Sequence, residues 1–228
     1  MPGRDRLPSR RHVTAPPAVG GRAKRALDLA IALPACVVLL PVMIAIGIWI
    51  RWDSAGPAIF RQERIGLRGR PFRLLKFRTM VVGAQQMGPG LAVDAGDARI
   101  TRAGHALRRL SLDELPQLWN VVRGDMSIVG PRPTVAAQVE RYTDEQRRRL
   151  DARPGITGLA QVRGRAAIPW SERIAIDVEY VAGWSIRRDL WILLRTAVVV
   201  ARRDGTYRGD SGGFDLPARD EEGTPSPR

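Results

Sequence analysis

Residues 29–50, LAIALPACVVLLPVMIAIGIWI, form a run of 22 residues without a charged side chain. Asp28 precedes the run and Arg51 follows it. A helix needs about 20 apolar residues to cross the hydrocarbon core of a bilayer, so this run is long enough to enter a membrane. Pro34 and Pro41 interrupt it, and each removes a backbone hydrogen bond that hydrocarbon cannot replace. The sequence therefore predicts a membrane helix that is broken near its middle.

Two membrane geometries are compatible with this broken run. A helix broken at Pro41 enters and leaves the bilayer on the same face, whereas a plain kinked transmembrane helix crosses it. Basic residues flank both ends of the run, so the positive-inside rule does not indicate the orientation of this segment in the membrane. We expect the re-entrant hairpin, and the crossing helix is the alternative.

The charge of the chain predicts an anionic partner. The formal net charge is +14 at pH 7; residues 1–25 contribute +6 and residues 204–228 contribute −3, so the body between them keeps about +11. Such an excess suits nucleic acid, lipid headgroups or a nucleotide substrate. The single cysteine excludes an intramolecular disulfide, and two histidines exclude a histidine-rich metal site.

Composition divides the chain into four segments. Residues 1–22 are rich in Arg, Pro, Gly and Ala and predict a disordered basic arm. Residues 23–53 hold the membrane hairpin, and residues 54–203 predict a compact domain. Residues 204–228 are rich in Gly, Pro and acids and predict a disordered tail.

The compact domain is predicted to be mainly α with a small β-hairpin, an α+β fold. Alternating runs at 58–65 and 72–77 predict the hairpin, which places Lys76 and Arg78 where a loop begins. Helices are predicted near 82–87 and at 102–110, 135–150, 170–181 and 186–203. The polar face of 135–150 is expected to be solvated, while 186–203 either lies flat in the membrane interface as an amphipathic helix or packs on the core.

An acidic pair stands before a helical apolar pattern in Ser111-Leu112-Asp113-Glu114-Leu115-Pro116-Gln117. The spacing Ser-x-x-Glu is also that of a helix capping box, which is the alternative interpretation. Pro116 favours a helix that begins at Asp113, because a proline within the first turn costs no hydrogen bond. Asp113 would then lie at the positive helix end, where backbone donors stabilise a carboxylate and attract phosphate. Together with Arg132, which lies between two prolines, the pair predicts phosphate chemistry.

Several further motifs occur in a fixed order along the chain. They are Lys24-Arg25-x-x-Asp28, Phe60-Arg61-Gln62-Glu63-Arg64-x-Gly66, Lys76-Phe77-Arg78-Thr79-Met80, Gly124-Asp125-Met126-Ser127, Val129-Gly130-Pro131-Arg132-Pro133, Arg153-Pro154-Gly155-Ile156-Thr157-Gly158 and Gly164-Arg165. With the acidic pair, this order resembles the bacterial sugar transferases, the monotopic polyprenyl-phosphate phosphoglycosyl transferases, over about residues 22–203. The segment before the membrane run is short, so we expect the short form of this family. Leu40 stands where many members have Ser before the proline.

The resemblance implies an activity and its partners. A sugar 1-phosphate would pass from a nucleoside diphosphate sugar, usually a UDP-sugar, to polyprenol phosphate, through a covalent phosphosugar-aspartate and with Mg²⁺ as cofactor. The location implied is the cytoplasmic face of the bacterial inner membrane, with membrane lipid as a partner and no nucleic acid. The oligomeric state stays open, a homodimer included.

The resemblance also implies roles for particular residues. Asp113 would be the nucleophile and a Mg²⁺ ligand, and Glu114 its partner in catalysis. Arg108, Arg132 and Arg165 match the phosphate contacts of the family, and we add Lys76 and Arg78 as phosphate-binding candidates. A covalent carboxylate lets a polar donor and a lipid acceptor use one site in turn, and fixed arginines stabilise the transferring phosphoryl group.

Two other classes of protein remain as rivals. A membrane-tethered module that binds nucleic acid or anionic lipid would explain the charge but gives the acidic pair no role. A catalytically inactive scaffold would explain the membrane run but not the acidic pair among arginines.

Overall fold

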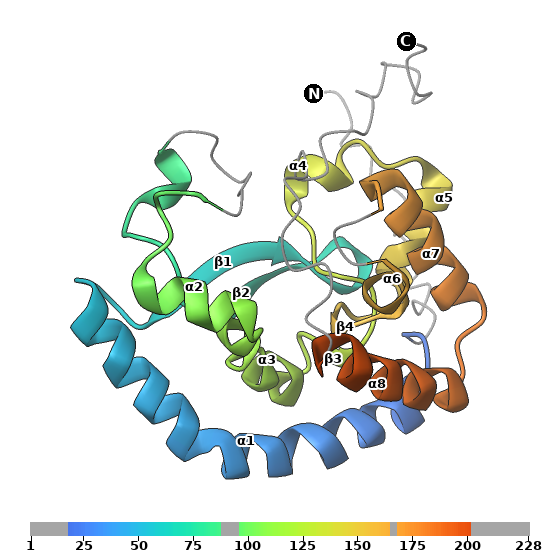
Figure 1. Cartoon of the computed structure of the whole chain (residues 1–228). Coiled ribbons are helices and arrows are strands. Elements are labelled where there is room, and N and C mark those ends of the chain that lie inside the picture. The colour runs from blue at the N-terminus through green and yellow to red at the C-terminus, as the bar shows by residue number, and fades with distance from the viewer. Residues whose placement is uncertain (1–17, 88–95, 165–167, 202–228) are drawn as a thin grey trace, which may run out of the picture.

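The computed structural model describes residues 18–87, 96–164 and 168–201 (Figure 1). The α-helices are α1 (Gly21–Asp53), α2 (Arg102–Arg109), α3 (Gln117–Arg123), α4 (Ala136–Val139), α5 (Asp144–Arg147), α6 (Leu159–Arg163), α7 (Trp170–Ala182) and α8 (Ile186–Ala201). The strands are β1 (Ile59–Ile65), β2 (Pro71–Phe77), β3 (Ser127–Val129) and β4 (Gly155–Thr157), and the 3₁₀ helices are η1 (Leu67–Gly69), η2 (Ala84–Gln86), η3 (Leu112–Glu114) and η4 (Arg148–Asp151). The predicted mainly helical fold with a small hairpin is confirmed. Most of the predicted arm, all of the predicted tail and Arg165 lie outside the described residues.

Helix α1 continues through both prolines and bends instead of breaking. Figure 1 shows α1 curved beneath the rest of the chain, with both of its ends rising toward the other elements. A proline removes one ladder bond and pushes away the preceding turn, which is the usual cause of a bend. Within the described residues, α1 is the one helix long and apolar enough to cross a membrane. Its outward apolar side chains are exposed: Leu33, Val37, Val38, Leu40, Val42, Ile44, Ile48, Trp49 and Trp52.

The N-terminal arm of α1 is fixed to the domain by charged side chains. Lys24 Nζ donates to Asp189 of α8 at 2.7 Å, and both groups are buried. Asp28 accepts hydrogen bonds from the Ser127 hydroxyl at 2.8 Å and the Ile128 amide at 2.9 Å, both in β3. The first motif of the chain therefore joins α1 to β3 and α8.

The C-terminal end of α1 is fixed to the same domain. Asp53 accepts a hydrogen bond from the amide of Ala103 in α2 at 3.0 Å. Ile46 and Ile50 of α1 pack in one buried cluster with Phe77, Ala103 and Leu107. Both ends of α1 thus contact one domain, which sits inside the curve of the helix.

Two small sheets form the interior. β1 and β2 pair antiparallel, from Ile59 opposite Phe77 to Ile65 opposite Pro71, as the alternating runs predict. β3 and β4 pair parallel. Backbones meet without side chains at the end of the second pair: a Cβ on Gly130 would lie 2.3 Å from the Arg153 carbonyl oxygen, and one on Gly158 would lie 2.2 Å from the Gly130 carbonyl oxygen. The glycines of these motifs are therefore required by close backbone packing.

The prediction of one solvated helix over 135–150 is wrong. The segment consists of α4, α5 and η4, and Thr143 begins α5 with a capping box closed by Gln146. This break turns Arg149 inward, where its guanidinium contacts Asp177 at 2.5 Å and the Tyr142 hydroxyl at 2.7 Å. Arg149 is fully buried and ties η4 to α7.

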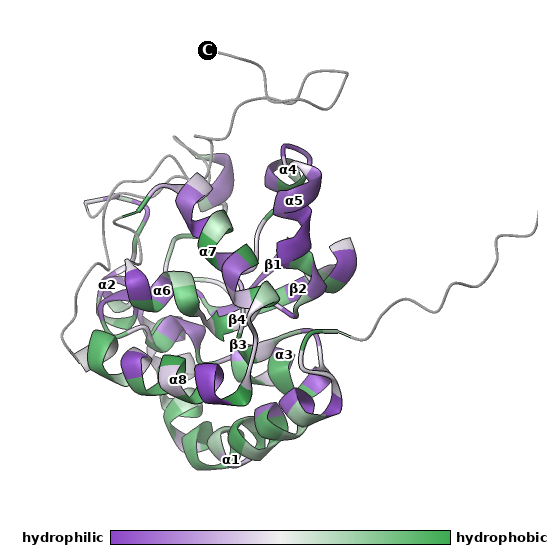
Figure 2. Ribbon diagram, turned by 90° about the vertical axis from the view of Figure 1, so that its right-hand side faces the viewer, coloured by the Kyte–Doolittle hydropathy of each residue, from purple (hydrophilic) through white to green (hydrophobic). Residues whose placement is uncertain are grey.

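Helix α8 has one face on the core and one apolar face outside. Asp189 and Ile192 are completely buried, which confirms the packing alternative for that face. Leu190, Trp191 and Leu194 are exposed, and Leu194 keeps 71% of its surface accessible. Figure 2 shows α8 beside α1 at the lower edge of the molecule, where hydrophobic residues gather.

Candidate active site

The acidic pair lies on a turn between two helices. α2 ends at Arg109, Ser111 adopts a left-handed conformation (φ 55°), and η3 carries Asp113 and Glu114. α3 begins only at Gln117, with Pro116 as its N-cap, so the prediction of a helix start at Asp113 is wrong. Proline still has helical angles there, but the chain before it winds as a 3₁₀ turn. Ser111 makes no side-chain cap, which rules out the capping box.

Three cations and two carboxylates come together at this turn. Glu114 Oε1 accepts hydrogen bonds from Lys76 Nζ at 2.8 Å and from an Arg132 guanidinium nitrogen at 2.9 Å. Lys76 Nζ also lies 3.7 Å from Asp113 Oδ2. Arg108 is near enough for its charge to act on Asp113. The turn, the end of β2 and the loop after β3 therefore converge on one site.

The two carboxylates are differently held. Burial raises the pKa of Asp113, which is 9% exposed; the charge of Glu114 adds to this effect and Lys76 opposes it. Burial also disfavours the Glu114 carboxylate, but Arg132 and Lys76 outweigh it and hold the pKa of Glu114 well below its ordinary value. Adjacent acids titrate as a pair in which one ionises first. Glu114 is thus the fixed anion, and Asp113 is the carboxylate without a direct cation hydrogen bond among the described contacts.

Arg108 is positioned by the end of β2. Its Nε donates to the Thr79 hydroxyl at 2.8 Å. One turn earlier in α2, Gly104 packs so tightly on this segment that a Cβ would lie 2.0 Å from the Thr79 carbonyl oxygen. The glycine lets α2 approach the strand end and bring Arg108 beside the acidic pair.

Arg78 has a different place from the predicted one. Its guanidinium donates to the carbonyl oxygens of Ser54 at 2.7 Å and Ala55 at 2.5 Å, just beyond the end of α1, and its side chain is buried. It binds the end of α1, and no hydrogen bond is described between Arg78 and the acidic pair, which corrects its assignment to phosphate. The assignment of Arg165 falls outside the described residues.

Three residues near the site were missed by sequence reasoning. Two nitrogens of the Arg64 guanidinium in β1 donate to the side-chain oxygen of Gln62. Burial lowers the pKa of Arg64 to about 10, and the charge of Arg132 adds to this effect. Asn120 of α3, completely buried, bonds the Arg73 carbonyl at 2.8 Å and the Leu75 amide at 3.0 Å, and so sets β2 before Lys76. Arg64 stands within a motif and shares a strand face with Gln62, which was the available signal for that residue.

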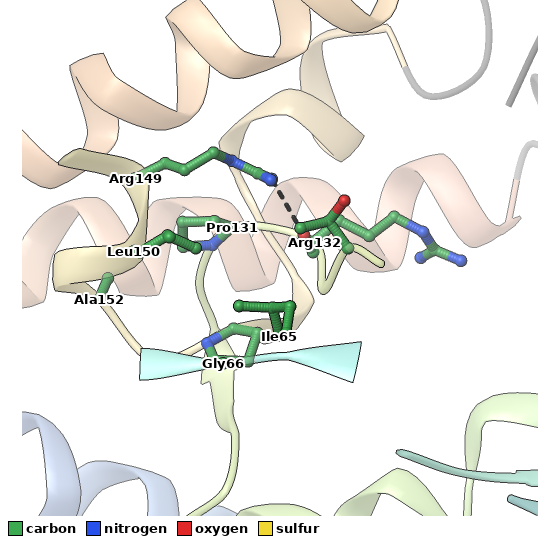
Figure 3. A pocket seen from close by; sticks show the side chains of 9 residues that line it. Ile65, Gly66, Pro131, Arg132, Arg149, Leu150 and Ala152 are labelled. Carbon is green, nitrogen blue, oxygen red and sulfur yellow. Dashed lines mark hydrogen bonds between the residues drawn. The ribbon is translucent and has the colours of Figure 1, made fainter. Parts of the chain in front are cut away.

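The third missed residue is Arg149. Its guanidinium donates to the Arg132 carbonyl oxygen at 3.0 Å. Figure 3 shows Arg149 pointing toward the backbone of Arg132, whose own side chain extends away, beside a small pocket lined also by Ile65 and Pro131. Arg149 therefore holds the loop that carries Arg132. A run of charges, Arg147 to Arg149, gave no signal for this role.

The donor set fits magnesium better than a transition metal. Within the described residues, no three His, Cys, Asp or Glu side chains gather as a metal site. Mg²⁺ commonly uses one or two carboxylates and takes its other ligands from water and substrate phosphate. Asp113 and Glu114 supply such a pair.

Comparison with known proteins places the chain in a family. The family described as "Bacterial sugar transferase" matches residues 19–203. A UDP-glucose:undecaprenyl-phosphate glucose-1-phosphate transferase of Caulobacter vibrioides is 45% identical over 193 residues, 81% of this chain and 72% of the relative. A UDP-galactose-lipid carrier transferase of Erwinia amylovora is 43% identical over 81% of this chain, which spans only 41% of that relative. The exopolysaccharide production protein ExoY of Sinorhizobium fredii is 37% identical over 83% of this chain and 90% of the relative. The chain belongs to the bacterial sugar transferase family.

Proposed function

We propose that this chain transfers a sugar 1-phosphate from a UDP-sugar to polyprenol phosphate through Asp113. The observation that carries the proposal is the division of the acidic pair: Glu114 is bound by Lys76 and Arg132, while Asp113 is left for chemistry. The names of relatives that act on UDP-glucose and undecaprenyl phosphate support the substrate class.

The reaction has two balanced steps. In the first, an Asp113 carboxylate oxygen attacks the phosphorus that bears the sugar, and the bond from this phosphorus to the bridging oxygen breaks, releasing UMP. In the second, a phosphate oxygen of the lipid attacks the same phosphorus and the Asp113 oxygen leaves, which gives polyprenyl diphosphate sugar. Covalent catalysis of this kind splits one transfer into two steps, so that two chemically unlike substrates can react in turn.

The cations around the pair have distinct work in these steps. Arg132 and Arg108 face the site with guanidinium groups, which suit phosphate oxygens and stabilise developing charge. Lys76 favours the ionised form of Asp113. Asp113 and Glu114 would hold Mg²⁺, which when bound neutralises phosphate charge.

We also propose that α1 enters and leaves the membrane on one face, the cytoplasmic face of the inner membrane. Lys24 and Asp28 at one end, and Asp53 at the other, contact the same domain. A crossing helix would place these ends on opposite sides of the bilayer. Single cysteines at Ala23 and Ala55, in a Cys36→Ala background, should react with an impermeant thiol reagent from the same side; labels on opposite sides would exclude the hairpin.

One experiment tests the chemistry. Purified full-length protein is incubated with Mg²⁺ and a panel of UDP-sugars, and mass spectrometry is expected to find a sugar-phosphate adduct on Asp113. Asp113→Asn, which keeps the shape of the side chain, should form no adduct and release no UMP. Equal UMP release by Asp113→Asn would disprove the covalent route. If no donor reacts even with polyprenol phosphate present, the inactive scaffold is favoured instead.

A further inference from the structure

We propose that Leu110, Leu115 and Trp119, here called the apolar strip, receive the prenyl tail of the acceptor lipid next to its phosphate. The inference rests on the proposed function and names a contact for its second substrate. It also separates the two half-reactions, because the polar donor has no tail to place there.

The apolar strip flanks the turn that carries the acidic pair. Leu110 is the C-cap of α2, immediately before the turn, and Trp119 lies in the first turn of α3, after it. Leu110 is 41% exposed and Trp119 is 54% exposed, while Leu115 is half-buried between them in sequence. Exposed apolar side chains rimmed by polar groups are typical of ligand-binding and membrane-contact surfaces.

The apolar strip belongs to the part of the chain that packs on α1. Leu115, just before α3, packs against the cluster that includes Ile46, and Val122 of α3 packs against the cluster that includes Ala32. Trp119 stands four residues after Leu115 and three before Val122, and side chains at these spacings share a helix face. Helix α3 packs on α1, and Figure 1 shows it inside the curve of that helix.

The chemistry of the acceptor matches this arrangement. Its phosphate must reach the phosphorus on Asp113 while its hydrocarbon chain stays out of water. Lys76 and Arg132 contact Glu114 on the turn, and Leu115 of the apolar strip packs in the buried cluster that includes Ile46 of α1. A tryptophan with one open face suits the boundary between headgroups and acyl chains. The strip would therefore lead the first isoprene units from the bilayer to the site.

The half-reactions give a direct test. Full-length protein in nanodiscs is first loaded with the UDP-sugar that forms the Asp113 adduct, and the adduct is then chased with polyprenyl phosphate. Trp119→Ala is expected to form the adduct at the wild-type rate and to need roughly tenfold more polyprenyl phosphate for half-maximal discharge. A short-chain prenyl phosphate that keeps the first isoprene units should show the same difference, because the strip contacts the tail next to the phosphate. Trp119→Phe should fall between the two proteins.

The matched control is Trp191→Ala on α8. Trp191 is 45% exposed and lies on α8, outside the turn and the helix that carry the apolar strip, so its removal should leave discharge unchanged. Equal discharge by Trp119→Ala and wild type would overturn the proposal, as would an equal effect of Trp191→Ala, which would mean general membrane seating. Slowing of both half-reactions in Trp119→Phe as well as Trp119→Ala would mean a misplaced turn and would also overturn it. Absence of any adduct in the wild type would instead refute the proposed function.

Discussion

Lys76 is the cation whose charge acts most directly on the Asp113 carboxylate. Burial raises the pKa of Asp113 and Lys76 lowers it, so removing the ammonium group raises that pKa further. The ionised form is the one that can act as the proposed nucleophile, and its fraction falls as pH falls through the pKa. Lys76→Met should therefore move the acid limb of adduct formation to higher pH, measured in single turnovers at saturating Mg²⁺.

Lys76→Arg is the control for this charge effect. It retains a cation that can reach Glu114, so its acid limb should stay near that of the wild type. An unchanged limb in Lys76→Met, with only a lower rate, would show that Lys76 contacts substrate without tuning Asp113.

Gly104 is required by a backbone contact and not by a turn. A Cβ there would lie 2.0 Å from the Thr79 carbonyl oxygen, so Gly104→Ala must push α2 off the end of β2. We expect a loss of about 1–3 kcal/mol in stability, measured by thermal unfolding in detergent, and a lower rate because Arg108 moves with α2. Gly47→Ala in α1 is the control: its Cβ would meet only the Ala58 side chain, at 3.8 Å, and should be neutral or stabilising.

At the scale of elements, the N-terminal arm of α1 depends on a buried ion pair. Lys24 is 4% exposed and contacts Asp189, which also accepts hydrogen bonds from Tyr180 at 2.7 Å and Trp184 at 3.0 Å. Removing one partner of a buried pair costs about 3–5 kcal/mol, because the other charge is left unpaired. Lys24→Met should therefore release the arm, seen as faster amide exchange over residues 24–32.

The double variant tests the cause. Lys24→Met with Asp189→Asn removes both charges of this ion pair, so the double variant should recover part of the stability and the exchange protection. No recovery would show that the lysine stem, and not its charge, holds the arm.

At the scale of the whole molecule, α1 and α8 present apolar side chains along one side. Leu194 points outward and Ile192 inward on the same helix. Leu194→Glu should weaken binding to lipid vesicles without lowering the unfolding temperature, whereas Ile192→Glu should destabilise the fold, since it buries a charge without a partner. Cosedimentation and thermal unfolding distinguish the two. Equal vesicle binding by Leu194→Glu would mean that α8 stays off the membrane.

Local patterns predicted much of this molecule. The hairpin follows from two short runs on either side of a glycine-containing turn, and α2, α7 and α8 follow from apolar spacing, because neighbours in sequence decide them. The pairing of Glu114 with Lys76 and Arg132 was predictable only as convergence of charges. The different roles of Glu114 and Asp113 depend on how deeply each carboxylate is buried, and a sequence motif does not indicate burial.

Arginines were the residues that sequence could not place. The sequence around Arg78 would be the same whether this side chain binds phosphate or helix carbonyls. Its partner is the carbonyl of Ser54, 24 residues earlier, and only the fold brings the two together. Arg149 follows two exposed-looking arginines, but the Thr143 cap turns it toward Asp177, 28 residues later. The helix start at Asp113 failed for a related reason: the 3₁₀ turn is held by contacts to β2 that lie outside the local pattern.

The last residues of β2 and those that follow it serve three parts of the molecule in succession. Lys76 reaches the acidic pair, Arg78 grips the end of α1, and Thr79 holds Arg108. This short segment therefore fixes the position of the acidic pair relative to the end of α1. In a bilayer this segment would keep the Asp113 carboxylate at one height above the lipid surface, so that polyprenol phosphate need not be lifted out of its leaflet to react.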